Sequence, residues 1–226
     1  MSNNVNVWQS IHTHYIDFAL LSLKNAKPRD AGIADPIHFD RGTVEAIRYS
    51  YDAIEASIEF TYSMGKTAQL REPIGESWLS RYLDRRWKSA PNSEKLPLMA
   101  QAWRNEPFWK NDDQQQLFED LRTLRGGLTH PRPYGVTVKG NTEKLLRPNW
   151  LVNKHPKAGF AETPEGLGQE DASVAVEIML RHLIRIEDLF FGGRDSFFSV
   201  FDRDLKDIVA TTDLLDRTGR AFDCMW

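Results

Sequence analysis

Residues 40–65 read DRGTVEAIRYSYDAIEASIEFTYSMG and contain the clearest helical pattern in the chain. Their apolar side chains recur at alternating steps of three and four residues, which places them on one face of an α-helix. These residues are Val44, Ile47, Tyr51, Ile54, Ile58 and Tyr62. Asp40 or Thr43 can cap the start of the helix, and Gly65 suits its end. Because the other face is charged and includes Glu55, the segment predicts a long amphipathic helix.

Four further segments show helical spacing. They run from Val7 to Pro28, from about Gly75 to Lys88, from Asn111 or Asp112 to Gly126, and from Asp171 to the glycines at 192 and 193. Prolines at 91 and 97 leave room only for a short helix over residues 98–103. The segment 197–215 is also helical in pattern. The pattern therefore predicts an all-α antiparallel helical bundle.

The same periodicity predicts which side of each helix is buried. In the first helix the expected buried stripe contains Tyr15, Phe18 and Leu21. In the helix near 75–88 the rings are interleaved with basic residues, a composition that suits base stacking and phosphate contact. A core stripe is the favoured interpretation of its rings, with the arginines in solvent. The residues of that expected stripe are Trp78, Leu79, Tyr82, Leu83 and Trp87.

Composition limits the function classes. Asp and Glu number 32 against 29 Lys and Arg, which gives a net charge of -3 and a pI near 6.1. Nonspecific attraction to polyanions is therefore not the main function, although a local basic patch remains compatible with these numbers. A single cysteine, Cys224, excludes an internal disulfide framework and a multi-cysteine zinc site, and no metal or cofactor is expected. The sequence shows no secretory signal and no apolar run of about 20 residues, so we expect a cytoplasmic protein without a membrane partner.

The segment with candidate chemistry is residues 118–133, FEDLRTLRGGLTHPRP. An amphipathic helix ends here with Arg122 and Arg125, and His130 follows Arg125 by five positions. Two glycines, 126 and 127, stand between the arginine and the histidine and should weaken the helix, since each costs about 1 kcal/mol relative to alanine. This stretch resembles the HEPN superfamily, whose members are usually dimeric helical bundles with an Arg-x(4–6)-His motif late in the bundle.

The resemblance implies metal-independent RNA cleavage, as in many members, or RNA or nucleotide binding or scaffolding, as in others. Arg125 and His130 match the two fixed positions of the motif, and Glu55 lies where related domains often have a polar residue on an earlier helix. An imidazole with the ordinary pKa of about 6.5 can remove a proton from a ribose 2′-hydroxyl. A guanidinium can stabilise the charge on the phosphate, and Arg122 is a candidate for a supporting phosphate contact.

The residue pattern and the resemblance together indicate an organisation for the chain. A single helical domain is expected over residues 1–226, with a HEPN-like core of about 40–135 plus 171–190. Residues 134–170 contain many glycines and prolines and are expected to form a long irregular insertion. Residues 195–226 are expected to form a C-terminal helical tail. One histidine per chain cannot easily act as both base and acid, so we expect a homodimer that places two motifs in one cleft. The activity would then be that of an endoribonuclease of the toxin or defence type. Such a protein could also have an antitoxin-like partner.

The glycines mark a departure from the family pattern, because active members usually have a polar residue directly after the arginine. A noncatalytic interpretation therefore stays open. In it, Arg125 caps helix carbonyls near the helix end, His130 anchors the turn by a hydrogen bond, and Arg122 is solvated. The protein would then be a helical interaction or nucleotide-binding module, contacting partners through the aromatic-rich segments 197–201 and 222–226.

Overall fold

A computed structural model describes residues 12–28, 40–66, 78–130, 138–139, 149–150, 155, 157–161 and 166–191. The helices among them are α1 His12–Asn25, α2 Arg41–Lys66, α3 Trp78–Arg86, α4 Asn92–Arg104, α5 Asp112–Thr129 and α6 Gln169–Phe191. Two short strands, β1 Val138–Lys139 and β2 Asn149–Trp150, pair antiparallel with Val138 opposite Trp150. The predicted all-α helical bundle is confirmed. The predicted helix at 197–215 lies outside the described residues, as does the start of the predicted helix at Val7.

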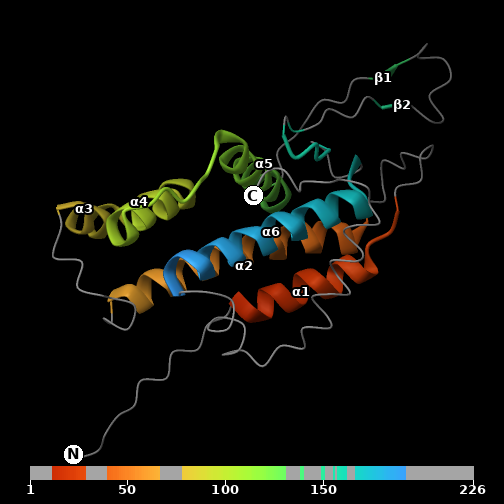
Figure 1. Ribbon diagram of the computed structural model, residues 1–226. Coiled ribbons are helices and arrows are strands. Elements are labelled where there is room, and N and C mark those ends of the chain that lie inside the picture. Colours follow the sequence, from red (N-terminus) through yellow and green to blue (C-terminus); the bar gives the residue numbers. More distant parts are fainter. Residues whose placement is uncertain are drawn as a thin grey trace, which may run out of the picture.

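The long helix α2 is the central element of the bundle. It packs against α1 and α6 along much of its length and also contacts α4 and α5 (Figure 1). Asp40 joins α2 to α1, because its Oδ2 accepts the backbone N–H groups of Thr43 at 2.8 Å and Lys27 at 3.1 Å. A Cβ at Gly42 would lie 2.8 Å from the backbone of Asn25, so only glycine allows this close approach. The end of α1 therefore meets the start of α2, and the two helices run antiparallel.

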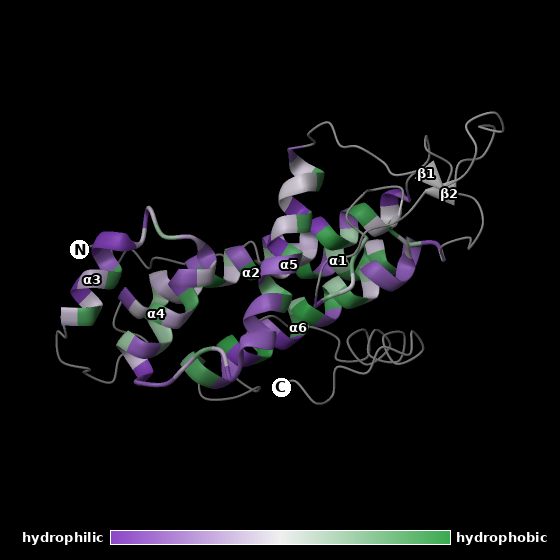
Figure 2. Cartoon of the chain, turned by 90° about the horizontal axis from the view of Figure 1, so that it is seen from above, coloured by the Kyte–Doolittle hydropathy of each residue, from purple (hydrophilic) through white to green (hydrophobic). Residues whose placement is uncertain are grey.

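The helix α6 runs parallel to α2. Its first residue, Gln169, donates its backbone N–H to the carbonyl of Lys27, beside the start of α2, and Phe191 at its end stacks on Phe60 near the end of α2. The core lies where α1, α2, α4, α5 and α6 meet, and Figure 2 shows the hydrophobic residues along these helices. Its large, fully buried side chains include Phe108, Phe118, Phe160, Phe190, Ile47, Ile54, Ile58 and Leu96. No helix in the described part of the chain is both long and apolar enough to span a membrane.

The predicted buried face of α1 is wrong for Phe18 and Leu21, whereas Tyr15 is half-buried and packs against the core. Phe18 is 46% and Leu21 58% exposed, and the buried apolar residues of this helix are Ile16, Ala19, Leu20 and Leu23. The helix has apolar residues on two sides, and periodicity alone does not say which side meets α2. Phe18 packs at the surface on the ring of Tyr49 instead, at a centroid distance of 5.3 Å.

The prediction for α3 is half right. Leu83 and Trp87 are buried, but Trp78 is 71% and Tyr82 42% exposed. Leu83 and Trp87 lie on one side of the helix, whereas Trp78 and Tyr82 lie about 140° away at 100° per residue. The helix is docked by its narrower apolar side, so the two outer rings remain in solvent.

Two predicted helix boundaries are also wrong, and a third, at Gly65, is right to within one residue. α4 begins at Asn92 and continues through Pro97, which removes one backbone hydrogen bond without ending the helix. Gly65 lies inside α2, where an added Cβ would come within 2.3 Å of the ring of Trp103. That glycine is therefore required for packing, and it also lies directly before Lys66, the last residue of α2. α5 continues across Gly126 and Gly127 to Thr129.

Part of the predicted insertion at 134–170 belongs to the core. Phe160 is fully buried, and Ala158 and Ala161 are nearly so. Asp120 of α5 holds this segment, because its Oδ2 accepts the backbone N–H groups of Lys157 at 2.9 Å and Ala158 at 2.8 Å. The backbone N–H groups of this segment bind the side chain of Asp120 where a helix would use its own carbonyls, so the segment remains irregular.

Candidate functional site

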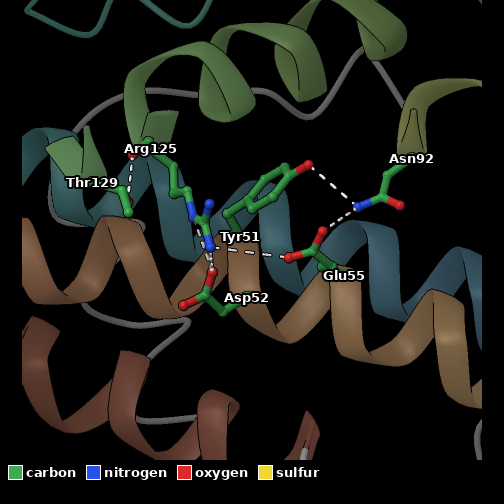
Figure 3. A network of polar contacts seen from close by, with 6 residues as sticks. All are labelled: Tyr51, Asp52, Glu55, Asn92, Arg125 and Thr129. Carbon is green, nitrogen blue, oxygen red and sulfur yellow. Dashed lines mark hydrogen bonds and ion pairs between the residues drawn. The ribbon is translucent and has the colours of Figure 1, made fainter. Parts of the chain in front are cut away.

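Arg125 lies on the inner edge of α5, one turn before the helix ends, and reaches across to α2. Its Nε and Nη2 both donate to Oδ1 of Asp52, at 3.0 and 2.7 Å (Figure 3). The side chains are 26% and 19% exposed, so the ion pair is partly shielded from water. Asp52 therefore fixes the guanidinium in one orientation and offsets part of its positive charge.

Glu55 lies one turn further along α2, on the same side of the helix. Its Oε2 is 4.0 Å from Nη2 of Arg125, the limit of an ion pair, and its Oε1 accepts a hydrogen bond of 2.8 Å from Nδ2 of Asn92. The carboxylate is thus shared between α5 and the first turn of α4 (Figure 3). The structure brings Glu55 and Arg125 together, as their proposed common site requires.

The ring of Tyr51 forms the floor of this cluster. The Cζ of Arg125 lies 5.4 Å from the centroid of the ring, within the range of a cation–π contact. The hydroxyl of Tyr51 accepts a longer hydrogen bond of 3.4 Å from Nδ2 of Asn92. Burial raises the pKa of Tyr51 above its ordinary value, so the phenol stays neutral at physiological pH.

His130 caps the C-terminus of α5. Its backbone N–H donates to the carbonyl of Gly126 at 3.0 Å, and the hydroxyl of Thr129 donates to the carbonyl of Arg125 at 2.9 Å. The first of these bonds satisfies one of the carbonyls that the end of a helix leaves free. The side chain of His130 is exposed, so the helix end presents an imidazole to solvent five residues after the held arginine.

Arg122 is also exposed, one turn before Arg125. Its Nε donates to Glu119 at 2.6 Å within the same helix, and its side chain is 45% exposed. Its positive charge acts on Tyr51 together with that of Arg125, and it lowers the pKa of the phenol slightly against the larger effect of burial. Arg122 therefore lies close to the cluster without entering its hydrogen-bond network.

The glycines of the motif leave an open surface between Arg125 and His130. A Cβ added at Gly126 or Gly127 would meet no atom of the described structure within 4 Å. The two glycines therefore have no packing function that the described residues reveal, although they cost about 2 kcal/mol of helix stability together. Their effect is to leave the backbone bare next to the arginine.

Asp52 and Glu55 begin a polar stripe on α2, which we define as Asp52, Glu55, Glu59, Tyr62 and Lys66. Steps of three and four residues place these side chains on one narrow face. Glu59 binds Lys95 of α4 at 2.6 Å and accepts the indole N–H of Trp87 at 2.9 Å. Tyr62 donates to Asp84 of α3 at 2.8 Å, and Lys66 binds the same carboxylate. The polar stripe thus holds α5, α4 and α3 in turn.

The sequence predicted Arg125, His130, Glu55 and Arg122, but it did not identify Asp52, Tyr51 or Asn92. One signal pointed to Asp52: it precedes Glu55 by three residues and so shares a helix face with it. Asn92 had no such signal, because its contact with Glu55 depends on how α4 docks. Within the described part of the chain, no cluster of three or more histidine, cysteine or acidic side chains could hold a metal ion.

Comparison with protein-family models, with curated proteins and with solved structures finds no match for this chain.

Proposed function

We propose that this chain is a HEPN-like, RNA-directed protein that cleaves RNA without a metal ion, using Arg125 and His130. The observation that carries the proposal is the end of α5. There, an arginine is held in one orientation by two α2 carboxylates, and an exposed histidine follows it across two bare glycines. A positioned guanidinium and a solvent-facing imidazole are the minimum set of groups for attack of a ribose hydroxyl on the adjacent phosphate.

The proposed reaction needs no water and no cofactor. The imidazole of His130 takes the proton of the 2′-hydroxyl, and the 2′-oxygen forms a bond to phosphorus as the bond to the 5′-oxygen breaks. The products are a 2′,3′-cyclic phosphate and a 5′-hydroxyl end. Arg125 stabilises the negative charge that grows on the phosphate oxygens. In a homodimer, His130 of a second copy would protonate the leaving 5′-oxygen.

The ion pair with Asp52 sets a condition on this chemistry. A phosphate must compete with Asp52 for the donors of Arg125, or use donors that Asp52 leaves available. The guanidinium has five N–H groups, and its two hydrogen bonds to Oδ1 of Asp52 use only two of them. Arg125 can therefore bind Asp52 and a phosphate at the same time. Asp52 would then orient Arg125 and reduce the entropy lost when phosphate binds.

A second function, a noncatalytic helical interaction or nucleotide-binding module, is favoured by the same ion pair. The contacts of Arg125 with Asp52 and Glu55 join α5 to α2, which is sufficient reason for an arginine at this position. On this proposal the exposed His130 has no chemical function, and an antitoxin-like or other protein partner would bind elsewhere on the bundle.

The two proposals differ in what Arg125→Ala and His130→Ala do to RNA. Purified protein is incubated with 5′-labelled single-stranded RNA in EDTA, and the products are tested for a 2′,3′-cyclic phosphate. The endoribonuclease proposal expects cleavage by the wild type and a loss of at least 100-fold in each variant. His14→Ala and Arg41→Ala serve as matched controls, because both residues are exposed and neither belongs to the cluster.

Each variant is also checked for its fold by circular dichroism and thermal unfolding. The endoribonuclease proposal fails if wild-type protein leaves single-stranded and structured RNA intact. It also fails if both motif variants cleave as fast as the controls. Dimer formation is measured independently by light scattering, and a monomer that cleaves RNA would remove the second histidine from the mechanism but leave the first in place.

A further inference from the structure

The helix α3 presents two aromatic rings and two arginines on one outward face. Trp78, Arg81, Tyr82 and Arg85 occupy positions i, i+3, i+4 and i+7, so they lie on the same side of the helix. All four are exposed, and Trp78, at 71%, is the most exposed large apolar side chain among the residues that the structure describes. The opposite side of α3 is docked through Leu83, which is buried. The helix therefore faces solvent with a surface of alternating rings and guanidinium groups, which we call the α3 face.

The two rings form a pair. Their centroids are 6.4 Å apart and their planes are tilted by 57°, so they are not stacked closely on each other. Each ring therefore has a flat side available to a second planar group. The helix has a sufficient apolar anchor without these rings, because Leu83 and Trp87 already fill the contact with the bundle. Exposed apolar patches that are rimmed by polar residues often mark interaction sites, and here the two neighbouring rings lie beside two arginines.

The positive charges of the α3 face are not neutralised by the described residues. The neighbouring acid Asp84 is turned towards α2, where it binds Tyr62 and Lys66. Glu94 pairs with Arg86, on the side of the helix next to α4. Arg81 and Arg85 are exposed, and neither has an ion pair in the described structure, nor does Lys88 just beyond the helix. The chain as a whole is acidic, with a net charge of -3, so this is a local reversal of charge.

We infer that the α3 face binds single-stranded nucleic acid, with bases stacked on Trp78 and Tyr82 and phosphates bound by Arg81 and Arg85. Rings alternating with guanidinium groups match a single strand, in which planar bases alternate with anionic phosphates. A membrane surface would require a broader apolar face than two rings on nine residues, and the remaining apolar side chains of α3 point into the bundle. The charge complementarity therefore favours a single strand over a lipid surface.

The α3 face has a fixed position relative to the cluster around Arg125. Tyr62, which holds α3 through Asp84, follows Asp52 on α2 by ten residues, which corresponds to about 15 Å along the helix. Both contacts belong to the polar stripe, so both sites are anchored on the same side of α2. The inference deepens the proposed function by naming where RNA binds, but it does not depend on cleavage.

The test is the affinity of the full chain for a fluorescein-labelled 12-nucleotide oligo(U), measured by fluorescence anisotropy. The expected result is that Trp78→Ala raises the dissociation constant about fivefold or more, which is the lower end of the effect of losing one stacked base. Arg81→Gln combined with Arg85→Gln should weaken binding and reduce the slope of log K against log salt by about 1.4, because each lost phosphate contact accounts for about 0.7. Oligo(dT) of equal length should respond in the same way, since stacking and phosphate contact do not require the 2′-hydroxyl.

Matched controls remove equivalent groups elsewhere. Phe18→Ala removes an exposed ring of α1, and Arg41→Gln removes an exposed charge at the start of α2, so neither should change the dissociation constant. The inference is overturned if wild-type protein does not bind oligo(U), or if Trp78→Ala binds it as well as the wild type does. The inference is also overturned if the Trp78→Ala variant loses binding to phosphatidylserine vesicles but still binds oligo(U) as the wild type does. Arg125→Ala should stop cleavage and keep most of the binding. Wild-type protein that binds oligo(U) but cleaves no RNA would contradict only the proposed function.

Discussion

Arg125 donates two hydrogen bonds to a single carboxylate oxygen of Asp52, at 3.0 and 2.7 Å, across a separation of 73 residues. This contact joins the last turns of α5 to the middle of α2. It also fixes the guanidinium in one orientation, directed from α5 towards α2. Its strength therefore affects both the stability of the bundle and any chemistry at the helix end.

Asp52→Asn is expected to lower the free energy of unfolding by about 1 kcal/mol, because a neutral amide keeps a hydrogen bond but loses the charge. The pair is about one-fifth to one-quarter exposed, which keeps the effect below that of a fully buried ion pair. Urea denaturation of Asp52→Asn, Arg125→Ala and the double variant measures the coupling. A coupling of at least about 0.5 kcal/mol is expected, and strictly additive effects would show that the two side chains do not interact in solution.

Gly126→Ala and Gly127→Ala are each expected to stabilise the protein by up to about 1 kcal/mol, because both positions are helical and open space surrounds the added methyl group. Thermal unfolding measures the gain. If phosphate approaches the bare backbone here, the same variants should lose RNA cleavage while they gain stability. A stable variant with unchanged cleavage would show that the glycines do not contribute to the site.

Gly65→Ala should have the opposite sign. The added methyl group would lie 2.3 Å from the buried ring of Trp103, and a ring held between Tyr62 and Phe190 has little room to move. We expect a loss of about 1–3 kcal/mol, measured by urea denaturation beside Gly126→Ala as the matched substitution. Equal effects of the two substitutions would mean that α2 and α4 do not pack as described.

His182 should make the stability depend on pH. Its ring lies within 5.1–6.3 Å of the rings of Phe108, Trp109 and Phe118, and Nδ1–H donates to the carbonyl of Ile178 at 2.7 Å. Burial lowers the pKa of His182 from 6.5 to about 4, an effect only partly offset by the hydrogen bond. Between these pH values the unfolded chain binds a proton that the folded chain excludes, so stability should fall as the pH drops from about 6.5 to about 4.

The loss attributable to His182 is at most about 3 kcal/mol, since each unit of pKa difference corresponds to 1.36 kcal/mol. Urea denaturation of the wild type and of His182→Phe at pH 7 and pH 5 measures the part of the stability loss that is due to His182. The variant keeps an aromatic ring but cannot be protonated. The variant should lose less stability on acidification than the wild type. Parallel losses in both proteins would place the pH dependence on other groups.

The sequence was sufficient to predict where most helices lie but not which side of each helix is buried. The periodic apolar residues of α2 and α6 identified both helices closely, and Asn111 caps α5 as predicted, accepting the N–H of Gln114 at 3.0 Å. In α1, by contrast, apolar residues lie on two sides, and only docking against α2 leaves Phe18 outside. Pro97 was expected to interrupt a helix that in fact continues, because a helix held by tertiary contacts tolerates the loss of one hydrogen bond.

The candidate site was predictable only in part for a similar reason. Arg125 and His130 are close in sequence, so a short pattern could identify them. Asp52 and Asn92 reach the cluster from other helices, and their contacts depend on the packing of α4 and α5 against α2. A charged helix face normally indicates solvent, and on α2 a section of that face binds three neighbouring helices instead.

The polar stripe also fixes the register of α2. One residue inserted between Glu55 and Glu59 would rotate the rest of the helix by about 100° and advance it by about 1.5 Å. Lys95 would then face an aliphatic side chain, and Asp84 would lose both of its partners on α2. Sliding of this helix past its neighbours is therefore opposed by the mismatch of charges, and not by the shape of the apolar core alone.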